Sequence, residues 1–170
     1  LLGTTLGASA RYDGTCSGGD GPELVYTFEV AETVGESRFE LDARAWGAWD
    51  TTLYLKRDEC EAAETVACND DHATLGRSSR IDLPELPPGR YFLFADGYGN
   101  SSSGVFELRA SLGPVLTPPA NEDCASAELL PLAPGPGVVL DEQVLHLAAD
   151  DLAPSCGVAG GADMTYLVHL

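Results

Sequence analysis

The sequence predicts an all-β protein folded as an antiparallel β-sandwich. Segments that alternate apolar and polar residues recur along the chain, as half-buried strands do. Turn signals rich in Gly, Pro, Asn and Asp separate them at intervals of about 8–15 residues, the spacing expected of a sandwich. No segment has the 3.6-residue period of an amphipathic helix, and the 19 glycines and 11 prolines among 170 residues do not suit long helices.

Four segments alternate most clearly, at residues 24–30, 37–43, 51–56 and 104–112. One face of each is expected to point into the core: Leu24, Tyr26, Phe28 and Val30; Phe39, Leu41 and Ala43; Leu53 and Leu55; Phe106, Leu108 and Ala110. Residues 90–95 are almost continuously apolar, which indicates a central strand buried on both faces. Shorter strands are expected at residues 65–67 and 79–83.

A proline-rich linker predicts two units. Residues 114–119 read PVLTPP, and adjacent prolines favour an extended spacer. We expect one sandwich in residues 1–113 and the first part of a second in residues 120–170. The strands expected in the second unit are residues 128–130, 138–140, 144–148 and 164–170.

Composition excludes several classes of protein. Asp and Glu number 27 against 9 Lys and Arg, a formal charge of −18, so no cationic face for nucleic acid is expected. No apolar run approaches the roughly 20 residues of a membrane span. A disordered acidic tail is excluded because 44% of the residues are hydrophobic.

Five cysteines suggest an oxidised, secreted protein. Cys60 and Cys68 flank a short loop between two predicted strands, so a Cys60–Cys68 disulfide would staple a hairpin. The alternative is that all five are buried thiols.

The remaining cysteines fit an internal repeat. Cys16 and Cys156 are 140 positions apart, and the 15 residues that begin at each align without a gap. In the second copy Cys124 precedes Cys156, which predicts a Cys124–Cys156 disulfide. The corresponding partner of Cys16 would lie outside this chain segment or in a neighbouring chain. Alternatively, Cys124 pairs with Cys16 and leaves Cys156 free.

Five motifs in a fixed order carry a resemblance to a known family. They are WDTTLYL (49–55), CNDD (68–71), RSSRIDL (77–83), LPPGRYFLFADGYG (86–99) and SGVFEL (103–108). In this order they resemble the bacterial pre-peptidase C-terminal domain, especially a cysteine-bearing tandem variety found in large secreted bacterial proteins. Residues 118–130 resemble the opening of the next unit in such an array.

The resemblance implies a jelly-roll-like sandwich without catalytic activity, here with N-terminal strand material missing. Members of the family are appended to secreted proteases and other exported proteins, or occur in arrays. Their suggested roles are binding, spacing, secretion and surface attachment. We therefore expect a secreted, extracellular or cell-surface location.

The best candidate for a metal site is acidic. Asn69, Asp70 and Asp71 form one turn, and Asp50 and Asp96 could approach it in a sandwich. Turn carboxylates and carbonyls together suit Ca²⁺, which takes six to eight oxygen ligands. The alternative is that these side chains only bond their own backbone, as Asx turns do.

Aromatic residues suggest a second surface. Trp46, Trp49 and Tyr98 could form a platform for sugar rings, and the alternative is packing at the sandwich edge. His72 near Ser78 and Ser79 lacks the G-x-S-x-G context of a nucleophile, so no hydrolytic triad is expected.

Together these features predict a non-catalytic secreted repeat with a structural, adhesive or fibre-forming role. Its expected partners are neighbouring repeats or copies of itself, and extracellular glycans. The alternatives are a calcium-dependent carbohydrate- or ligand-binding module and an accessory domain of a secreted hydrolase.

Overall fold

In the computed structural model, the described residues are 1–16, 20–130, 145–150, 152 and 160–168. The backbone groups into two compact units, Leu1–Val115 and Leu116–Leu170. The predicted strand at residues 138–140 lies outside the described residues.

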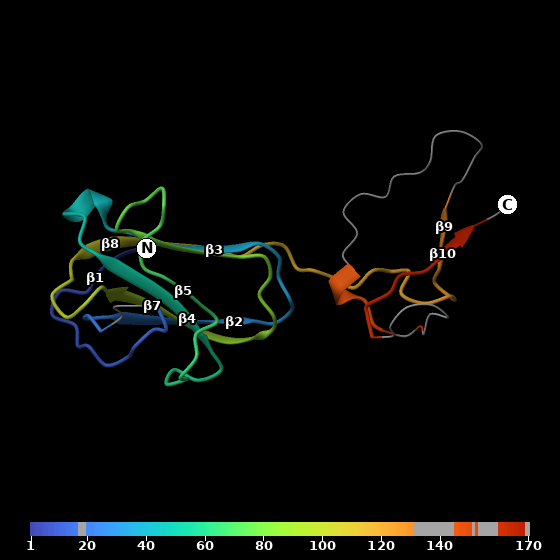
Figure 1. The fold of residues 1–170 in the computed structure, drawn as a ribbon, viewed down its shortest axis with the longest axis horizontal. Coiled ribbons are helices and arrows are strands. Elements are labelled where there is room, and N and C mark those ends of the chain that lie inside the picture. The colour runs from blue at the N-terminus through green and yellow to red at the C-terminus, as the bar shows by residue number, and fades with distance from the viewer. Residues whose placement is uncertain (17–19, 131–144, 151, 153–159, 169–170) are drawn as a thin grey trace. The chain divides into compact units, whose positions relative to one another are not determined.

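The first unit consists of two four-stranded antiparallel sheets packed face to face (Figure 1). One sheet has the order β1 (Leu2–Thr4), β8 (Val105–Ser111), β3 (Ser37–Asp42), β6 (Ser79–Leu83). The other has the order β2 (Leu24–Val30), β7 (Gly89–Gly97), β4 (Thr51–Arg57), β5 (Ala67–Asn69). This strand order is that of an eight-stranded jelly roll, so the predicted all-β sandwich is confirmed.

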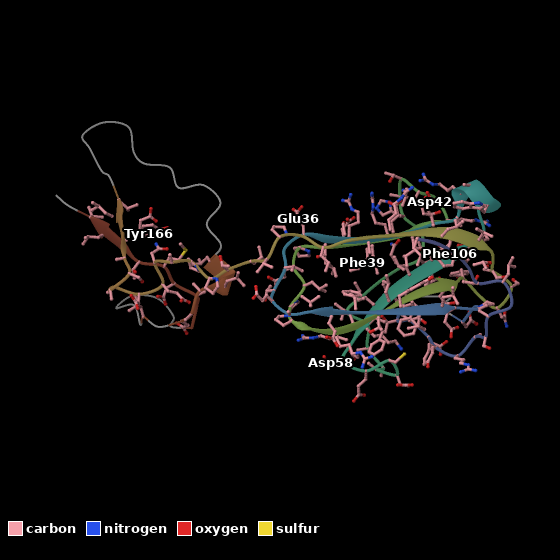
Figure 2. All side chains as sticks on the ribbon, turned by 180° about the vertical axis from the view of Figure 1, so that it is seen from behind. Glu36, Phe39, Asp42, Asp58, Phe106 and Tyr166 are labelled. Carbon is pink, nitrogen blue, oxygen red and sulfur yellow. A yellow bond between two sulfur atoms is a disulfide. The ribbon has the colours of Figure 1, made fainter. Side chains whose placement is uncertain are left out.

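The core between the sheets comes from the predicted alternation of side chains. Phe39 and Leu41 on β3 face Leu53 and Leu55 on β4, and all four are almost fully buried. Figure 2 shows Phe39 and Phe106 pointing into the space between the two layers. Burying each such side chain stabilises the fold by roughly 1.5–3 kcal/mol.

Ala110 is an exception to the predicted core. It is exposed, although it shares the face of Phe106 and Leu108 on β8. Strand β1 pairs with β8 from Glu107 to Val105 only, so no neighbouring strand covers the Ala110 end on that side.

Strand β7 is buried on both faces, as predicted. Leu93 points into the core, and Phe94 points to the opposite face of the β2–β7–β4–β5 sheet. That outer face is covered by residues 8–16, which we call the covering segment and which runs in dark blue beneath the sheet in Figure 1. Its Tyr12 ring packs edge-on against Phe94, with 5.4 Å between ring centroids.

Several short elements differ from the sequence prediction. Strand β1 was not predicted, and the strand expected at 65–67 lies two residues later, as β5. A 3₁₀ turn, η1 (Arg44–Trp46), follows β3. In the second unit, β9 (Glu128–Leu130) pairs in parallel with β10 (Tyr166–Val168).

The prediction of a strand at residues 144–148 is wrong. Residues Leu145–Leu147 form a second 3₁₀ turn, η2, closed by the Ala148 N–H, which donates to the Leu145 carbonyl at 2.9 Å. Alternation alone cannot make a strand without a partner, and no described strand pairs with this segment. No helix among the described residues is both long and apolar enough to cross a membrane.

Candidate functional site

Three carboxylates meet at one end of the first sandwich. Asp50 immediately precedes β4, and Asp70 and Asp71 immediately follow β5. Because β4 and β5 are antiparallel, with Leu53 opposite Asn69, the start of one strand lies beside the end of the other. One oxygen from each of the three carboxylates lies within 4.8 Å of the other two. We call these residues the acidic cluster.

The turn that holds the acidic cluster is fixed by side chain to backbone contacts. The Ser79 hydroxyl lies 2.6 Å from the Asp70 carbonyl and 2.8 Å from the Thr51 carbonyl. Asn69 accepts a hydrogen bond from the Arg80 N–H at 2.9 Å and donates one to the Asp71 carbonyl at 3.3 Å. Asn69 therefore stabilises the turn, and both the oxygen and the nitrogen of its side-chain amide already have backbone partners.

The acidic cluster has little internal charge compensation. Burial, together with the neighbouring carboxylates, raises the pKa of Asp50 and of Asp70. The nearest cation is the exposed Arg77, whose Nε lies 3.8 Å from Asp50 Oδ2. Asp50 Oδ1 is buried and has no hydrogen-bond partner among the described residues. An acceptor-only oxygen of this kind suits a metal ion, so Asp50, Asp70 and Asp71 could hold one.

Asp96 does not belong to the acidic cluster, contrary to the sequence prediction. It lies opposite Thr52 in the sheet, and its fully buried side chain accepts hydrogen bonds from Tyr54 Oη at 3.2 Å and the Gly97 N–H at 2.6 Å. Burial raises the pKa of Asp96 to about 7. Side chains alternate along β7, so an Asp next to a turn in sequence is directed here to the covered face of the sheet.

Two cysteine predictions are wrong: the Cys60–Cys68 disulfide, and a partner for Cys16 outside the chain. Cys16 is bonded to Cys68, with 5.7 Å between their Cα atoms. Cys68 lies opposite Tyr54 on the outer face of the sheet, where the covering segment passes. Gly14 lies directly against the Tyr54 ring, which brings Cys16 over Cys68.

The structure describes two further cysteines, Cys60 and Cys124. Cys60 is a half-buried free thiol, positioned to interact with the Tyr12 hydroxyl. Cys124 is exposed, and its predicted partner Cys156 lies outside the described residues. The Cys124–Cys156 disulfide therefore stays a prediction.

The aromatic residues have different surroundings. Trp49 is half-buried: its Nε1 donates to the Val105 carbonyl at 2.9 Å, and its ring meets Phe106 edge-on. Trp46 and Tyr98 are 38% and 42% exposed. Trp49 is thus part of the sandwich wall, and only Trp46 and Tyr98 present much ring surface to solvent.

The histidine and serine near the acidic cluster have separate partners. The His72 ring nitrogen Nδ1 lies 3.2 Å from Thr74 Oγ1. Ser78 donates to Asp42 Oδ1 at 3.3 Å and accepts from the Ala43 N–H at 3.1 Å. Among the described residues, no hydrogen bond joins the His72 ring to a serine hydroxyl; His72 and Ser78 meet through their backbones, where the His72 N–H donates to the Ser78 carbonyl at 3.1 Å.

Lys56 is a further charged residue that the sequence prediction did not single out. It lies on β4, on the same face as Tyr54, and only 4% of its surface is exposed. The sequence contained a signal: the one lysine of the chain alternates with the inward-facing leucines of its strand and therefore lies on the other face of the sheet.

Comparison with known proteins gives distant likenesses to solved structures only. No family model and no curated protein matches the chain. A solved structure that does match is the pre-peptidase C-terminal domain of collagenase from Bacillus anthracis. The two are 22% identical with a TM-score of 0.46, over 65% of this chain and 86% of that one. That domain bears the family name that the sequence motifs resemble, but a likeness at this level says nothing about activity or ligands.

Proposed function

We propose that this chain is a non-catalytic extracellular β-sandwich module with a structural or adhesive role. The observation that carries the proposal is the Cys16–Cys68 disulfide, which fixes the covering segment to the edge strand β5. Disulfides form and persist mainly in secreted and surface proteins. A sheet covered on both faces and closed by a cross-link suits a module that must persist outside the cell.

Other copies of the chain or neighbouring repeats are the proposed partners, with assembly into fibres. The apparent 140-residue repeat and the proline-rich linker support this part of the proposal. Light scattering during size-exclusion chromatography, with electron microscopy of the eluted species, tests it on the full chain. Concentration-dependent polymers would support assembly, whereas a compact monomer at every concentration would contradict it.

A second proposed function is calcium binding at the acidic cluster. It is supported by the three converging carboxylates and by the unpartnered Asp50 Oδ1. Several turn oxygens suit the high coordination number of Ca²⁺ better than the strict octahedron of Mg²⁺. Affinities of extracellular modules lie at about 10⁻⁴ to 10⁻³ M, which is the range expected here.

Isothermal titration with CaCl₂ and with MgCl₂ tests this proposal. The expected result is saturable heat with calcium, lost in Asp70→Asn and kept in Asp58→Asn. Asp58 is an exposed carboxylate outside the acidic cluster and is the matched control. Equal heats for Asp70→Asn and the unmodified chain would contradict calcium binding at this cluster.

Extracellular glycans are the proposed ligands of a calcium-dependent module. Trp46 and Tyr98 are exposed enough to stack on sugar rings, and Trp49 is held in the wall. A glycan array probed with and without calcium tests this. Binding that Trp46→Ala abolishes would support it, and an array without any hit would contradict it.

The remaining alternative, an accessory domain of a secreted hydrolase, is supported by the sequence resemblance alone. The full gene tests it, since a catalytic domain encoded in the same reading frame would favour it. A gene that encodes only sandwich repeats would contradict it.

A further inference from the structure

The basic residues of this acidic chain fall into two groups. Nine Lys and Arg side chains stand among 27 carboxylates, so each has many possible partners. Most of the arginines have a carboxylate within 4.0 Å: Arg38, Arg44, Arg57, Arg77, Arg80 and Arg109. Within the described part of the chain, Arg11, Lys56 and Arg90 have no such ion pair.

Two of these three unpaired cations line the same pocket. It has a volume of about 340 Å³ and lies between the covering segment and the loop that joins β4 to β5. Arg11 comes from the covering segment, and Lys56 comes from β4 beneath it. Arg90 lies elsewhere, with its guanidinium 5.1 Å from the Phe92 ring centroid.

Lys56 is the unusual member, because it is buried. Its Nζ lies 5.3 Å from the centroid of the Phe94 ring and 5.7 Å from that of Tyr54, both within cation–π range. No described residue forms a hydrogen bond or ion pair with this nitrogen. The nitrogen is nevertheless not among the buried unpartnered atoms of the described residues, so its three N–H donors are accessible from the pocket that Lys56 lines.

The acids of the same pocket do not supply those acceptors. Asp13 and Glu61 also line it, but neither carboxylate lies within 4.0 Å of the Lys56 nitrogen. Both are exposed at the rim of the pocket. They leave its formal charge close to neutral, which disfavours a dianion such as phosphate and tolerates a monoanion.

We propose that Lys56 and Arg11 bind the carboxylate group of a small ligand in this pocket. The Lys56 side chain supplies one cationic donor to the pocket, and the planar guanidinium of Arg11 offers the paired donors that match a carboxylate. Asp13 and Glu61 at the rim then select ligands that carry one negative charge. This site is separate from the acidic cluster and does not depend on calcium.

The single lysine makes the proposal directly measurable. With ¹⁵N-labelled lysine incorporated into the full chain, the only side-chain ammonium resonance comes from Lys56. We expect sodium acetate to shift this resonance saturably, whereas sodium chloride at the same ionic strength shifts it weakly and linearly. Identical responses to acetate and chloride would overturn the proposal, as would saturation by inorganic phosphate without saturation by acetate.

Matched arginine variants distinguish a contact in the pocket from the effect of the chain's overall charge. Arg11→Gln should weaken acetate binding about tenfold, the loss of a charge-assisted contact. Arg90→Gln removes the same charge outside the pocket and should leave binding unchanged. Both variants keep Lys56, so its labelled resonance reports binding in each of them. Equal weakening by the two arginine variants would overturn the pocket assignment.

Discussion

The two faces of the β2–β7–β4–β5 sheet are both buried, but by different means. On the inner face, Leu53 and Leu55 pack against the opposite sheet and make a continuous apolar core. On the outer face, Tyr54, Lys56 and Asp96 carry polar groups and are covered by a loop instead of a sheet. The same strand, β4, therefore contributes its alternate side chains to two chemically different interiors.

The buried Lys56 and Asp96 of this sheet both lie on the face that a loop covers. An apolar interior is satisfied by packing alone, whereas each buried polar group on the outer face must find a partner. Tyr54 and Asp96 find each other at 3.2 Å, and Lys56 has only aromatic faces. We therefore expect substitutions on the inner face to change stability only, and those on the outer face to change its dependence on redox state and pH as well.

Removal of the cross-link should have the largest effect. The double variant Cys16→Ser with Cys68→Ser opens a loop of 52 residues, which should cost about 4 kcal/mol in the chain-entropy description. Urea denaturation followed by tryptophan fluorescence measures the free energy of unfolding. Cys60→Ser is the control and should change it by less than about 0.5 kcal/mol. A large loss in Cys60→Ser would indicate a Cys60–Cys68 bond instead.

Truncation of a side chain in the inner core should have the second-largest effect on stability. Leu55→Ala leaves a cavity between the two sheets and should cost about 3 kcal/mol in the same denaturation experiment. Val25→Ala on β2 is the comparison, since Val25 is 37% exposed, and it should cost well under half as much. Equal losses in the two variants would mean that the inner face is not the main core.

The buried Asp96 should make stability depend on pH. Its pKa is raised by burial from 3.8 to about 7, so the folded state binds the proton more tightly than the unfolded chain does. The stabilisation from this group is full below about pH 4 and is lost as the pH rises through 7. Between pH 5 and 8 the free energy of unfolding should fall by about 2–3 kcal/mol more in the unmodified chain than in the variant Asp96→Asn.

A carboxylate in solvent is the control for this titration. Asp58 lies at the surface in Figure 2, and its side chain is 69% exposed. Asp58→Asn should therefore keep the pH dependence of the unmodified chain. If Asp96→Asn also kept it, Asp96 would not be the group responsible.

Disturbing the contact between the covering segment and the sheet should have the smallest effect on stability. A Cβ atom added at Gly14 would lie 2.8 Å from Tyr54 Cδ1, so Gly14→Ala must shift the segment. The expected cost is about 1–2 kcal/mol, as for other overpacked sites. Gly161 has no atom within 4 Å of its added Cβ, and Gly161→Ala should leave stability unchanged. A neutral Gly14→Ala would mean that the covering segment is loosely packed.

The inner core was predictable from the sequence because it depends on local alternation. Phe39, Leu41, Leu53 and Leu55 are apolar at every second position, and this period alone assigns them to one face. The burial of Phe94 beside Leu93 was predictable too, because an unbroken apolar run needs cover on both sides.

The outer face was not predictable, because it depends on a contact distant in sequence. Nothing near Cys68 indicates that Cys16 lies above it, and the nearer Cys60 is the natural choice when only spacing is considered. Asp96 was misplaced for a related reason. Its position beside a Gly-rich turn suggested exposure, but the strand continues to Gly97 and places Asp96 under the covering segment. Asp50, Asp70 and Asp71 were brought together as predicted, since antiparallel pairing of adjacent strands is a local event.

The Cys16–Cys68 bond also has a mechanical consequence. Under tension applied at the two ends of the chain, force passes through the bond and bypasses the 52-residue loop that it closes. Fully stretched, such a loop would add about 180 Å to the chain. That length stays hidden under oxidising conditions and is released only by a reductant, so the redox state of the surroundings sets how far the first unit can be extended.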